Sequence, residues 1–403
     1  MKKILFLFAT FFILISNVNA IDIYSSNMVL YNLSDDIIVD SVNKDDIVSI
    51  ASMTKVMTAL VAIENIDDIE DMAVISEDAF DGLEEENASL AGFYVGESVT
   101  YEDLLYGTLL PSGAEAATAL ALNISGSVYD FVTLMNNKAD ELGLSNTHFS
   151  NVTGIDDDNN YSTVNDVAII LETAFSNEIF KNIFMSSSYL TSDKSLTLYS
   201  TLYKSALLYD IDLPYVVGGK TGYTLNAGRC LASIAYDEVN DIYYLLVTAG
   251  APTTTSYYHL LDAQNIYEYY FENYGYQNVV DIGDTLVSIK TKYTKEKSFD
   301  LNSLSDITIY GSNDFDKSKV TLEYDGISFI SGNMSEGTKL GVVNAYYDGE
   351  IIKTFDVLLD RDIHFSIFMF ILSNIHFVIL LLIILYFISK LKKKKKKKVR
   401  RVR

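Results

Sequence analysis

Cysteine and histidine are too scarce in this 403-residue sequence to build most kinds of metal or disulfide site. The single cysteine, Cys230, excludes an internal disulfide framework and any Cys-rich zinc or iron–sulfur site. The four histidines show no paired spacing typical of metal ligands. Basic residues are outnumbered, 30 against 54 acidic ones, and a formal net charge of −24 disfavours a nucleic-acid-binding protein. We therefore expect no metal, no cofactor and no nucleic-acid partner.

Tryptophan is absent and proline occurs only three times, so the sequence has no Pro-rich linker. Hydrophobic residues make up 49% of the chain and charged residues 21%, a composition that excludes disordered and collagen-like classes. A single hydrophobic core stops growing near ~250–300 residues. The length therefore predicts at least two domains.

Charge is distributed unevenly along the chain. Residues 390–403 hold eleven basic and no acidic residues, and residues 1–20 hold only Lys2 and Lys3. The remaining 17 basic residues and all 54 acidic residues lie in 21–362, which gives that interval a net charge of −37. The sequence thus describes an acidic body with basic ends.

The first 20 residues have the features of a signal peptide. Lys2 and Lys3 precede an apolar run over residues 4–15, and Val18-Asn19-Ala20 places small residues at −3 and −1 before a cleavage point. The alternative is an uncleaved membrane anchor, but the run is too short to span a bilayer comfortably. We expect a signal peptide at residues 1–20 and an exported body.

Residues 363–389 predict a transmembrane helix, since residues 363–388 contain no acidic residue, lysine or arginine. His364, Asn374 and His376 leave an interfacial amphipathic helix as the alternative. The basic residues 390–403 then form a cytoplasmic tail by the positive-inside rule and contact anionic lipid rather than nucleic acid. The expected location is the cell membrane, with one span and the body outside the cell.

The body divides by pattern near Gly275. Residues 21–275 mix helices and strands, with apolar positions at helical spacing from Met53 to Val61 and further helices predicted over 114–123, 128–142, 164–175 and 255–274. Strands are predicted over 28–31, 37–40, 229–235 and 242–249, the last two as an antiparallel pair. Residues 276–362 contain short strands separated by Gly, Asn and Asp turns. This order predicts an α+β fold followed by a small all-β domain.

Three short motifs have the residue types of nucleophilic catalysis. Ser52 and Lys55, three positions apart at the predicted start of a helix, lie on one helix face. A serine hydroxyl needs a base to become a nucleophile, and a lysine is one if burial or a second cation lowers its pKa. Ser112, before the Ala-rich helix, is placed to relay protons. Each serine taken alone is also well explained as a helix cap, and Lys55 as a surface lysine.

The third motif is Lys220-Thr221-Gly222-Tyr223, at the start of a predicted strand hairpin. A lysine and a hydroxyl beside glycine can hold a carboxylate, while the strand edge pairs with a peptide. A phosphate-binding loop is the competing interpretation. It fails because Pro214 stands where the first glycine is required and no helix follows.

In this order the motifs resemble Ser-x-x-Lys, Ser-x-Asn and Lys-Thr-Gly of the penicillin-binding proteins and serine β-lactamases. The resemblance narrows to low-molecular-mass penicillin-binding proteins that are serine-type D-alanyl-D-alanine carboxypeptidases, the group of penicillin-binding proteins 5 and 6. Additional segments similar to this family are residues 51–60, 96–100, 103–105, 125–127, 147–149, 151–154 and 161–163. The resemblance runs from about Ser26 to Leu359, more weakly over the β-rich part.

The resemblance implies a β-lactamase/transpeptidase-like catalytic domain that removes the terminal D-alanine from peptidoglycan stem pentapeptides. Ser52 would be the nucleophile, Lys55 its base and Ser112 the proton relay. Substrate binding would fall to Lys220, Thr221, Gly222 and Tyr223, with Lys220 and Thr221 holding the terminal carboxylate, and the backbone N–H groups of Ser52 and Tyr223 would form the oxyanion hole. β-Lactams would act as covalent inhibitors.

Two departures from the family pattern keep an alternative open. Ala114 stands where the second motif normally ends in Asn, and His259 aligns with a position that often carries a carboxylate-binding Arg. The alternative is a catalytically impaired relative that binds wall peptide or partner proteins. A secreted β-lactamase is less favoured, because we find no segment assignable as a deacylating loop with its Glu.

Overall fold

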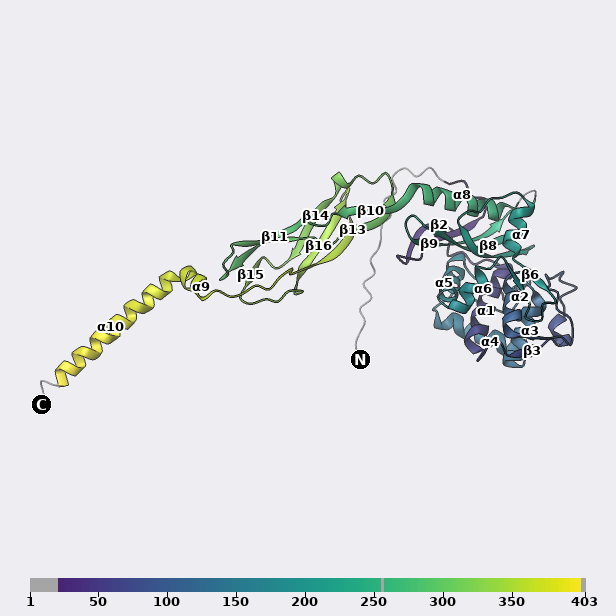
Figure 1. The fold of residues 1–403 in the computed structure, drawn as a ribbon, viewed down its shortest axis with the longest axis horizontal. Coiled ribbons are helices and arrows are strands. Elements are labelled where there is room, and N and C mark those ends of the chain that lie inside the picture. Colours follow the sequence, from purple (N-terminus) through teal and green to yellow (C-terminus); the bar gives the residue numbers. More distant parts are fainter. Residues whose placement is uncertain (1–20, 255–256, 400–403) are drawn as a thin grey trace. The chain divides into compact units, whose positions relative to one another are not determined.

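The computed structural model describes residues 21–254 and 257–399, and no side chain beyond residue 393. The signal peptide expected at residues 1–20 lies outside the described residues. The described residues form two compact units, residues 21–273 and residues 274–399 (Figure 1). The first unit contains every candidate catalytic residue.

An antiparallel five-stranded sheet is the frame of the first unit. Its strand order is β2-β1-β9-β8-β7, so the first two strands of this unit and its last three belong to one sheet. The strands are β1 (Asn27–Asn32), β2 (Ile37–Val42), β7 (Val216–Thr224), β8 (Gly228–Asp237) and β9 (Ile242–Ala251). β7 lies at one edge, and no strand within the described part of the chain pairs with its outer side. The edge strand holds the third motif.

Helices cover both faces of this sheet (Figure 1). One side is covered by α8 (Tyr258–Asn273), which packs on β8 and β9, and the other by α5 (Val164–Phe175) and α6 (Glu178–Phe184). The remaining helices of the unit are α1 (Thr54–Asn65), α2 (Tyr101–Leu109), α3 (Ala114–Ser125), α4 (Val128–Glu141) and α7 (Thr201–Leu208). Two-stranded pairs complete it: β3 (Met72–Val74) with β4 (Ser98–Thr100), and β5 (Ser188–Leu190) with β6 (Thr197–Tyr199).

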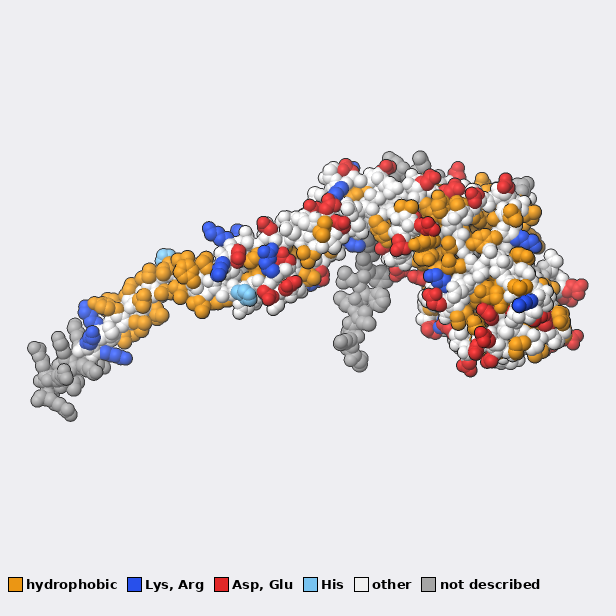
Figure 2. Space-filling model, in the orientation of Figure 1, with side chains coloured by type: hydrophobic (Ala, Val, Ile, Leu, Met, Phe, Trp, Pro, Cys, Tyr) orange, Lys and Arg blue, Asp and Glu red, His pale blue; other side chains and the backbone are white. Residues whose placement is uncertain are grey.

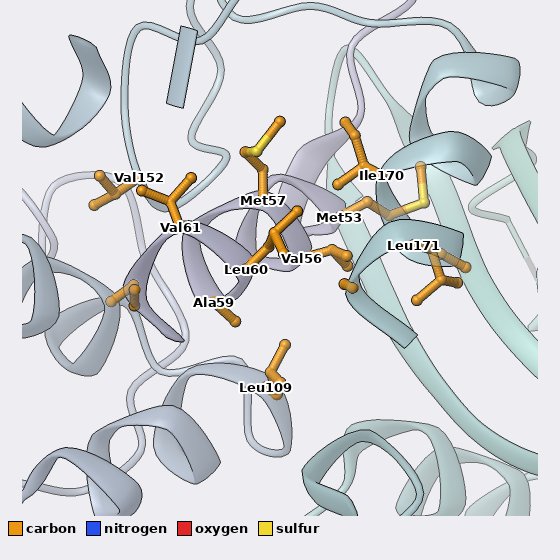
Figure 3. Packing of buried hydrophobic residues seen from close by; sticks show 14 of the residues in the cluster. Met53, Val56, Met57, Ala59, Leu60, Val61, Leu109, Val152, Ile170 and Leu171 are labelled. Atoms are coloured by element: carbon orange, nitrogen blue, oxygen red, sulfur yellow. The ribbon is translucent and has the colours of Figure 1, made fainter. Parts of the chain in front are cut away.

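The core of the unit is built around α1, which is buried on all sides from Thr54 to Ile63. In Figure 3 its apolar side chains point in several directions, toward Leu109 of α2 and toward Ile170 and Leu171 of α5. The polar Thr58 fits because its hydroxyl donates to the carbonyl of Val152 at 2.8 Å. The apolar spacing in the sequence predicted this helix. That spacing indicates a helix with one buried face, whereas α1 is buried on every face.

The α+β fold class predicted from the sequence is confirmed. The helices predicted at 128–142 and 164–175 are α4 and α5, where Ser127 and Thr163 cap the N-termini by accepting from Asp130 and Asp166. One prediction was wrong in detail: Ser52 does not open the α-helix. A 3-10 turn over Ala51–Met53 comes first, and α1 begins at Thr54.

The second unit is all β between residues 274 and 358, apart from a 3-10 turn at Lys317–Lys319. Its strands are β10 (Tyr274–Val280), β11 (Thr285–Lys292), β12 (Ser298–Asn302), β13 (Ile307–Ser312), β14 (Thr321–Gly326), β15 (Phe329–Ser331), β16 (Lys339–Tyr347) and β17 (Glu350–Leu358). They form small sheets in the orders β10-β13, β12-β11-β15 and β14-β16-β17. Two apolar clusters form its core, one around Val343 and one around Ala345. The predicted all-β domain is confirmed.

Two helices follow, α9 (Ile367–Ser373) and α10 (Ile375–Val399). The helix predicted for residues 363–389 is thus interrupted at Asn374, whose side chain donates to the Phe370 carbonyl at 2.8 Å. Residues Ile375–Lys393 of α10 have a mean hydropathy of 2.1 and are long and apolar enough to cross a membrane. Their apolar side chains are exposed, and Figure 2 shows them covering the helix up to the first lysines.

Candidate active site

Ser52 and Lys55 meet at the turn that precedes α1. The Lys55 ammonium lies 3.0 Å from Ser52 Oγ and donates at 2.6 Å to the carbonyl of Thr153. Ala51 adopts a left-handed conformation with φ of 46°, which is unusual outside glycine and is typical of strained functional turns. Ser52 is not a helix cap, because the N-cap of α1 is Met53 and no side chain caps it. The serine hydroxyl therefore faces the amine.

Lys55 is 2% exposed, so it is not a surface lysine. Burial lowers its pKa to about 7, since a desolvated ammonium loses the water that stabilises its charge, and Glu115 partly opposes this effect. A large fraction of Lys55 is consequently neutral near pH 7. A neutral amine at hydrogen-bonding distance from a serine hydroxyl has the geometry of a general base.

Ser112 and Lys220 form a second hydroxyl–amine pair. The Lys220 ammonium donates to Ser112 Oγ at 2.8 Å and to its neighbour's carbonyl, Thr221 O, at 2.8 Å. Lys220 is fully buried, and burial together with the nearby Lys55 charge holds its pKa well below the usual value. Ser112 has a φ of 66° and does not cap α3, whose N-cap is Gly113. The cap interpretation therefore fails here as well.

The edge strand β7 approaches the nucleophile turn closely at Gly222. A Cβ there would lie 3.1 Å from Ala51 Cβ and 3.2 Å from Ser52 N, so a larger residue would push the strand away. Thr221 is held by a 2.7 Å hydrogen bond between its hydroxyl and that of Thr201, the first residue of α7. Tyr223 is half exposed at the rim.

Gly154 closes the other side of the nucleophile turn. Its φ is +81°, and a Cβ would lie 1.9 Å from the carbonyl oxygen of Ala51. Because only glycine tolerates both the conformation and the contact, the loop can bring the Thr153 carbonyl onto Lys55. Asn151 stabilises the loop by accepting from the backbone N–H groups of Thr153 and Gly154.

These groups open into a cavity of about 640 Å³. Its lining includes six of the seven predicted site residues: Ser52, Lys55, Ser112, Thr221, Gly222 and Tyr223. The seventh, Lys220, lies behind Ser112. The structure thus brings together residues from a turn, a helix start and an edge strand. Among the described residues, no cluster of three or more His, Cys, Asp or Glu side chains could hold a metal ion.

Ala114 lines the same cavity in place of the asparagine that the motif usually carries. The absence of that side chain put the orientation of the active-site lysine in question. In this chain the Thr153 carbonyl and Ser52 Oγ already fix Lys55 from two directions. Lysine orientation is therefore secured by a loop backbone.

The sequence analysis missed Arg229, which also lines the cavity. Arg229 is the cross-strand partner of Tyr223, and its guanidinium carbon lies 3.8 Å from the ring centroid of Tyr257 and 5.5 Å from that of Tyr223. Its Nε is buried and has no hydrogen-bond partner in the described part of the chain. A guanidinium held by two aromatic rings at a cavity wall is suited to bind an anion.

His259, the expected counterpart of the family arginine, lines the cavity but is uncharged. Burial, helped by the charge of Arg229, lowers its pKa to about 3. Its Nδ1 is buried without a partner among the described residues. The cation at this wall is therefore Arg229 on β8. Pairing between β7 and β8 places it there, a relation that motif spacing does not reveal.

Comparison with known proteins agrees with this geometry. Residues 15–253 match the D-alanyl-D-alanine carboxypeptidase family model, and residues 274–364 match the model of the penicillin-binding protein 5 C-terminal domain. D-alanyl-D-alanine carboxypeptidase DacF of Bacillus subtilis is 31% identical over 79% of this chain and 81% of its own length. D-alanyl-D-alanine carboxypeptidase DacA of Haemophilus influenzae is 28% identical over 85% of this chain and 86% of its own length.

Solved structures show the same fold. Penicillin-binding protein 5 from Haemophilus influenzae superposes with a TM-score of 0.64 at 26% identity, covering 85% of this chain and 98% of that one. The Streptomyces K15 DD-transpeptidase superposes with a TM-score of 0.56 at 29% identity, covering 62% of this chain and 98% of that one.

The fold is that of a penicillin-binding protein, with a serine and lysine at the centre of its cavity. The chain belongs to the D-alanyl-D-alanine carboxypeptidase family, whose members are serine hydrolases. The family resemblance and the enzyme class predicted from the sequence are both confirmed.

Proposed function

We propose that this protein removes the terminal D-alanine from peptidoglycan stem pentapeptides through an acyl-enzyme on Ser52. The observation that supports this most is the 3.0 Å contact between Ser52 Oγ and the buried Lys55 amine, whose pKa is lowered to about 7. A buried amine that is largely neutral at physiological pH can accept the serine proton as the new bond forms.

In the acylation step, Ser52 Oγ bonds to the carbonyl carbon of the penultimate D-alanine while its proton moves to Lys55 Nζ. The negative oxygen of the tetrahedral intermediate is stabilised by the backbone N–H groups of Ser52 and Tyr223. Collapse breaks the carbon–nitrogen bond. Ser112, in contact with Lys220, gives its proton to the departing amine and takes up the proton that Lys55 holds, so that D-alanine leaves and Lys55 is neutral again.

In deacylation, a water molecule attacks the Ser52 ester, Lys55 takes its proton, and the shortened peptide leaves as Ser52 regains its hydrogen. A β-lactam also acylates Ser52, but it releases no leaving group. Its amide opens onto Ser52, but the ring nitrogen stays tethered to the acyl group and blocks water. β-Lactams are therefore expected to form a long-lived ester at Ser52.

The substrate's terminal carboxylate is bound by Thr221 and Arg229, with Lys220 behind them. The proposal is supported by the aromatic-flanked guanidinium of Arg229 at the cavity wall, whose buried Nε has no partner among the described residues. An anionic substrate end needs a local cation here, because residues 21–362 carry a net charge of −37. Tyr223 and the open edge of β7 are available to pair with the peptide backbone.

Arg229→Ala is expected to raise KM for a D-Ala-D-Ala peptide and lower kcat/KM roughly 10- to 100-fold, the range for losing a charge-assisted hydrogen bond. Steady-state release of D-alanine measures this. The matched control is a peptide ending in D-alaninamide, which has no carboxylate, so the variant and the wild type should turn it over equally. An equal loss on both peptides would refute carboxylate binding by Arg229.

The function itself is tested with the full-length protein in detergent and a pentapeptide ending in D-Ala-D-Ala. One equivalent of D-alanine per peptide is expected, and none from a peptide ending in L-alanine. Penicillin labelling without D-alanine release would instead favour the alternative, a relative that binds wall peptide or partner proteins. The changed residue Ala114 is the observation behind that alternative.

We further propose that residues 21–275 are the D,D-peptidase domain and that residues 276–362 are a β-rich C-terminal domain outside the membrane. Residues 363–389 would contain the membrane anchor, and residues 390–403 would lie at its cytoplasmic face. The apolar segment Ile375–Lys393 and the basic residues after it support this topology.

The full chain is expected to stay in the membrane fraction after carbonate extraction, whereas a variant that ends at Asp362 should be recovered in the soluble fraction. Fractionation followed by penicillin labelling measures both. Carbonate release of the full chain would argue for the interfacial alternative.

A further inference from the structure

Glu115 is a fully buried carboxylate beside the active site that has no part in the proposed acyl transfer. It lies in the first turn of α3, three residues after Ser112. Its Oε1 accepts the backbone N–H groups of Ala91 at 2.6 Å, Gly92 at 2.8 Å and Phe93 at 3.4 Å. Its Oε2 is buried and has no partner among the described residues. Burial of an ionisable group at such cost needs a reason.

The segment that Glu115 binds directly continues one wall of the cavity. Residues 86–89 line the cavity, and residues 88–93 contain no helix or strand. The Ala114 N–H donates to the carbonyl of Ser89 at 2.8 Å. A Cβ on Gly113 would lie 2.6 Å from that of Ala91, so the two segments touch along their backbones. The position of the wall is thus coupled to the start of α3 and to the adjacent Ser112.

Glu115 also acts on the charges of the site. The Glu115 carboxylate is the charge that acts on the buried Lys55, whereas the charge of Lys55 in turn acts on the Lys220 amine. The negative charge of Glu115 raises the pKa of Lys55 and so opposes burial. Burial raises the pKa of Glu115 itself, but the three backbone N–H groups stabilise its ionised form.

We propose that Glu115 is a positioning residue that fixes the wall segment 88–93 against the second motif and supplies a negative charge that moves the working pH range of Lys55 upward. The second part rests on the proposed role of Lys55 as the general base, and the first part does not. Two substitutions of Glu115 test the two parts separately, because one removes the charge of the side chain and the other shortens the side chain.

Glu115→Gln keeps an oxygen for the three N–H groups and removes the charge. The acid limb of its acylation profile with a fluorescent penicillin is expected to move to lower pH by roughly one unit, as Lys55 loses a favourable charge. Glu115→Asp keeps the charge but is one methylene too short to reach the segment. Its acylation rate should fall roughly tenfold with the acid limb unmoved, and amide exchange over residues 88–93 should become faster.

The control is Glu85→Gln, an exposed carboxylate of the preceding segment that does not line the cavity. It should leave the pH profile and the exchange rates unchanged. An unmoved acid limb in Glu115→Gln overturns the electrostatic part, and unchanged exchange in Glu115→Asp overturns the positioning part. All variants are measured as full-length protein in detergent. If the wild type were not acylated at all, the proposed function would fail while the exchange experiment still tested the wall.

Discussion

Replacing Ser52 with alanine is expected to abolish covalent labelling by a fluorescent penicillin, with a loss of at least ~10⁴-fold in acylation rate. The reason is that the proposed base contacts this hydroxyl: the Lys55 amine lies against Ser52 Oγ, whereas Ser112 Oγ lies against the Lys220 amine. The fold should remain. Among the described residues, Ser52 Oγ forms hydrogen bonds only with Lys55 Nζ and, at 3.5 Å, with the Thr153 carbonyl, so the free energy of unfolding should change by about 1 kcal/mol or less.

The matched control for this prediction is Ser145→Ala, an exposed serine of the same domain. This variant should label as the wild type does, and thermal unfolding should show both variants folded. Persistent labelling of a folded Ser52→Ala variant would mean that the nucleophile lies elsewhere.

The acylation rate is expected to rise about tenfold between pH 6 and pH 8. Lys55 can accept a proton only when neutral, and a pKa of about 7 makes roughly a tenth of it neutral at pH 6 and most of it neutral at pH 8. Stopped-flow labelling across pH 5–9 measures the profile. Lys55→Ala should lower the rate by ~10²–10⁴-fold, the usual contribution of a general base, and should remove this limb.

A wild-type profile without a limb near pH 7 would contradict the assignment of Lys55 as the base. A limb that persists in Lys55→Ala would assign the titration to another group, and Lys220 would then be the first to examine because its pKa is lowered by the same burial.

Much of the fold could be predicted because local patterns determine it. The helices α4 and α5 combine apolar spacing with capping residues, and their bounds in the structure are Val128–Glu141 and Val164–Phe175. The three-residue strands β3 to β6 were not predicted, since so short a segment has no measurable alternation. The start of α1 was placed two residues early, because the 3-10 turn at Ala51–Met53 has no sequence signal of its own.

The candidate site was predictable only in part. Helix spacing alone was enough to predict that Ser52 and Lys55 lie close together. The contact between Ser112 and Lys220 joins residues 108 positions apart, and only the family resemblance indicated it. Arg229 escaped notice because its place depends on the β7–β8 register opposite Tyr223. Glu115 and Thr153 act through backbone groups of distant loops, which residue spacing does not encode.

The most direct test of an acyl-enzyme on Ser52 is the mass of its peptide after the full-length protein is treated with a penicillin and digested. The peptide that contains Ser52 should gain the mass of one intact penicillin, and fragmentation should locate the adduct on the serine oxygen. A penicillin adduct found only on another residue, or no adduct on folded protein at saturating penicillin, would contradict the mechanism.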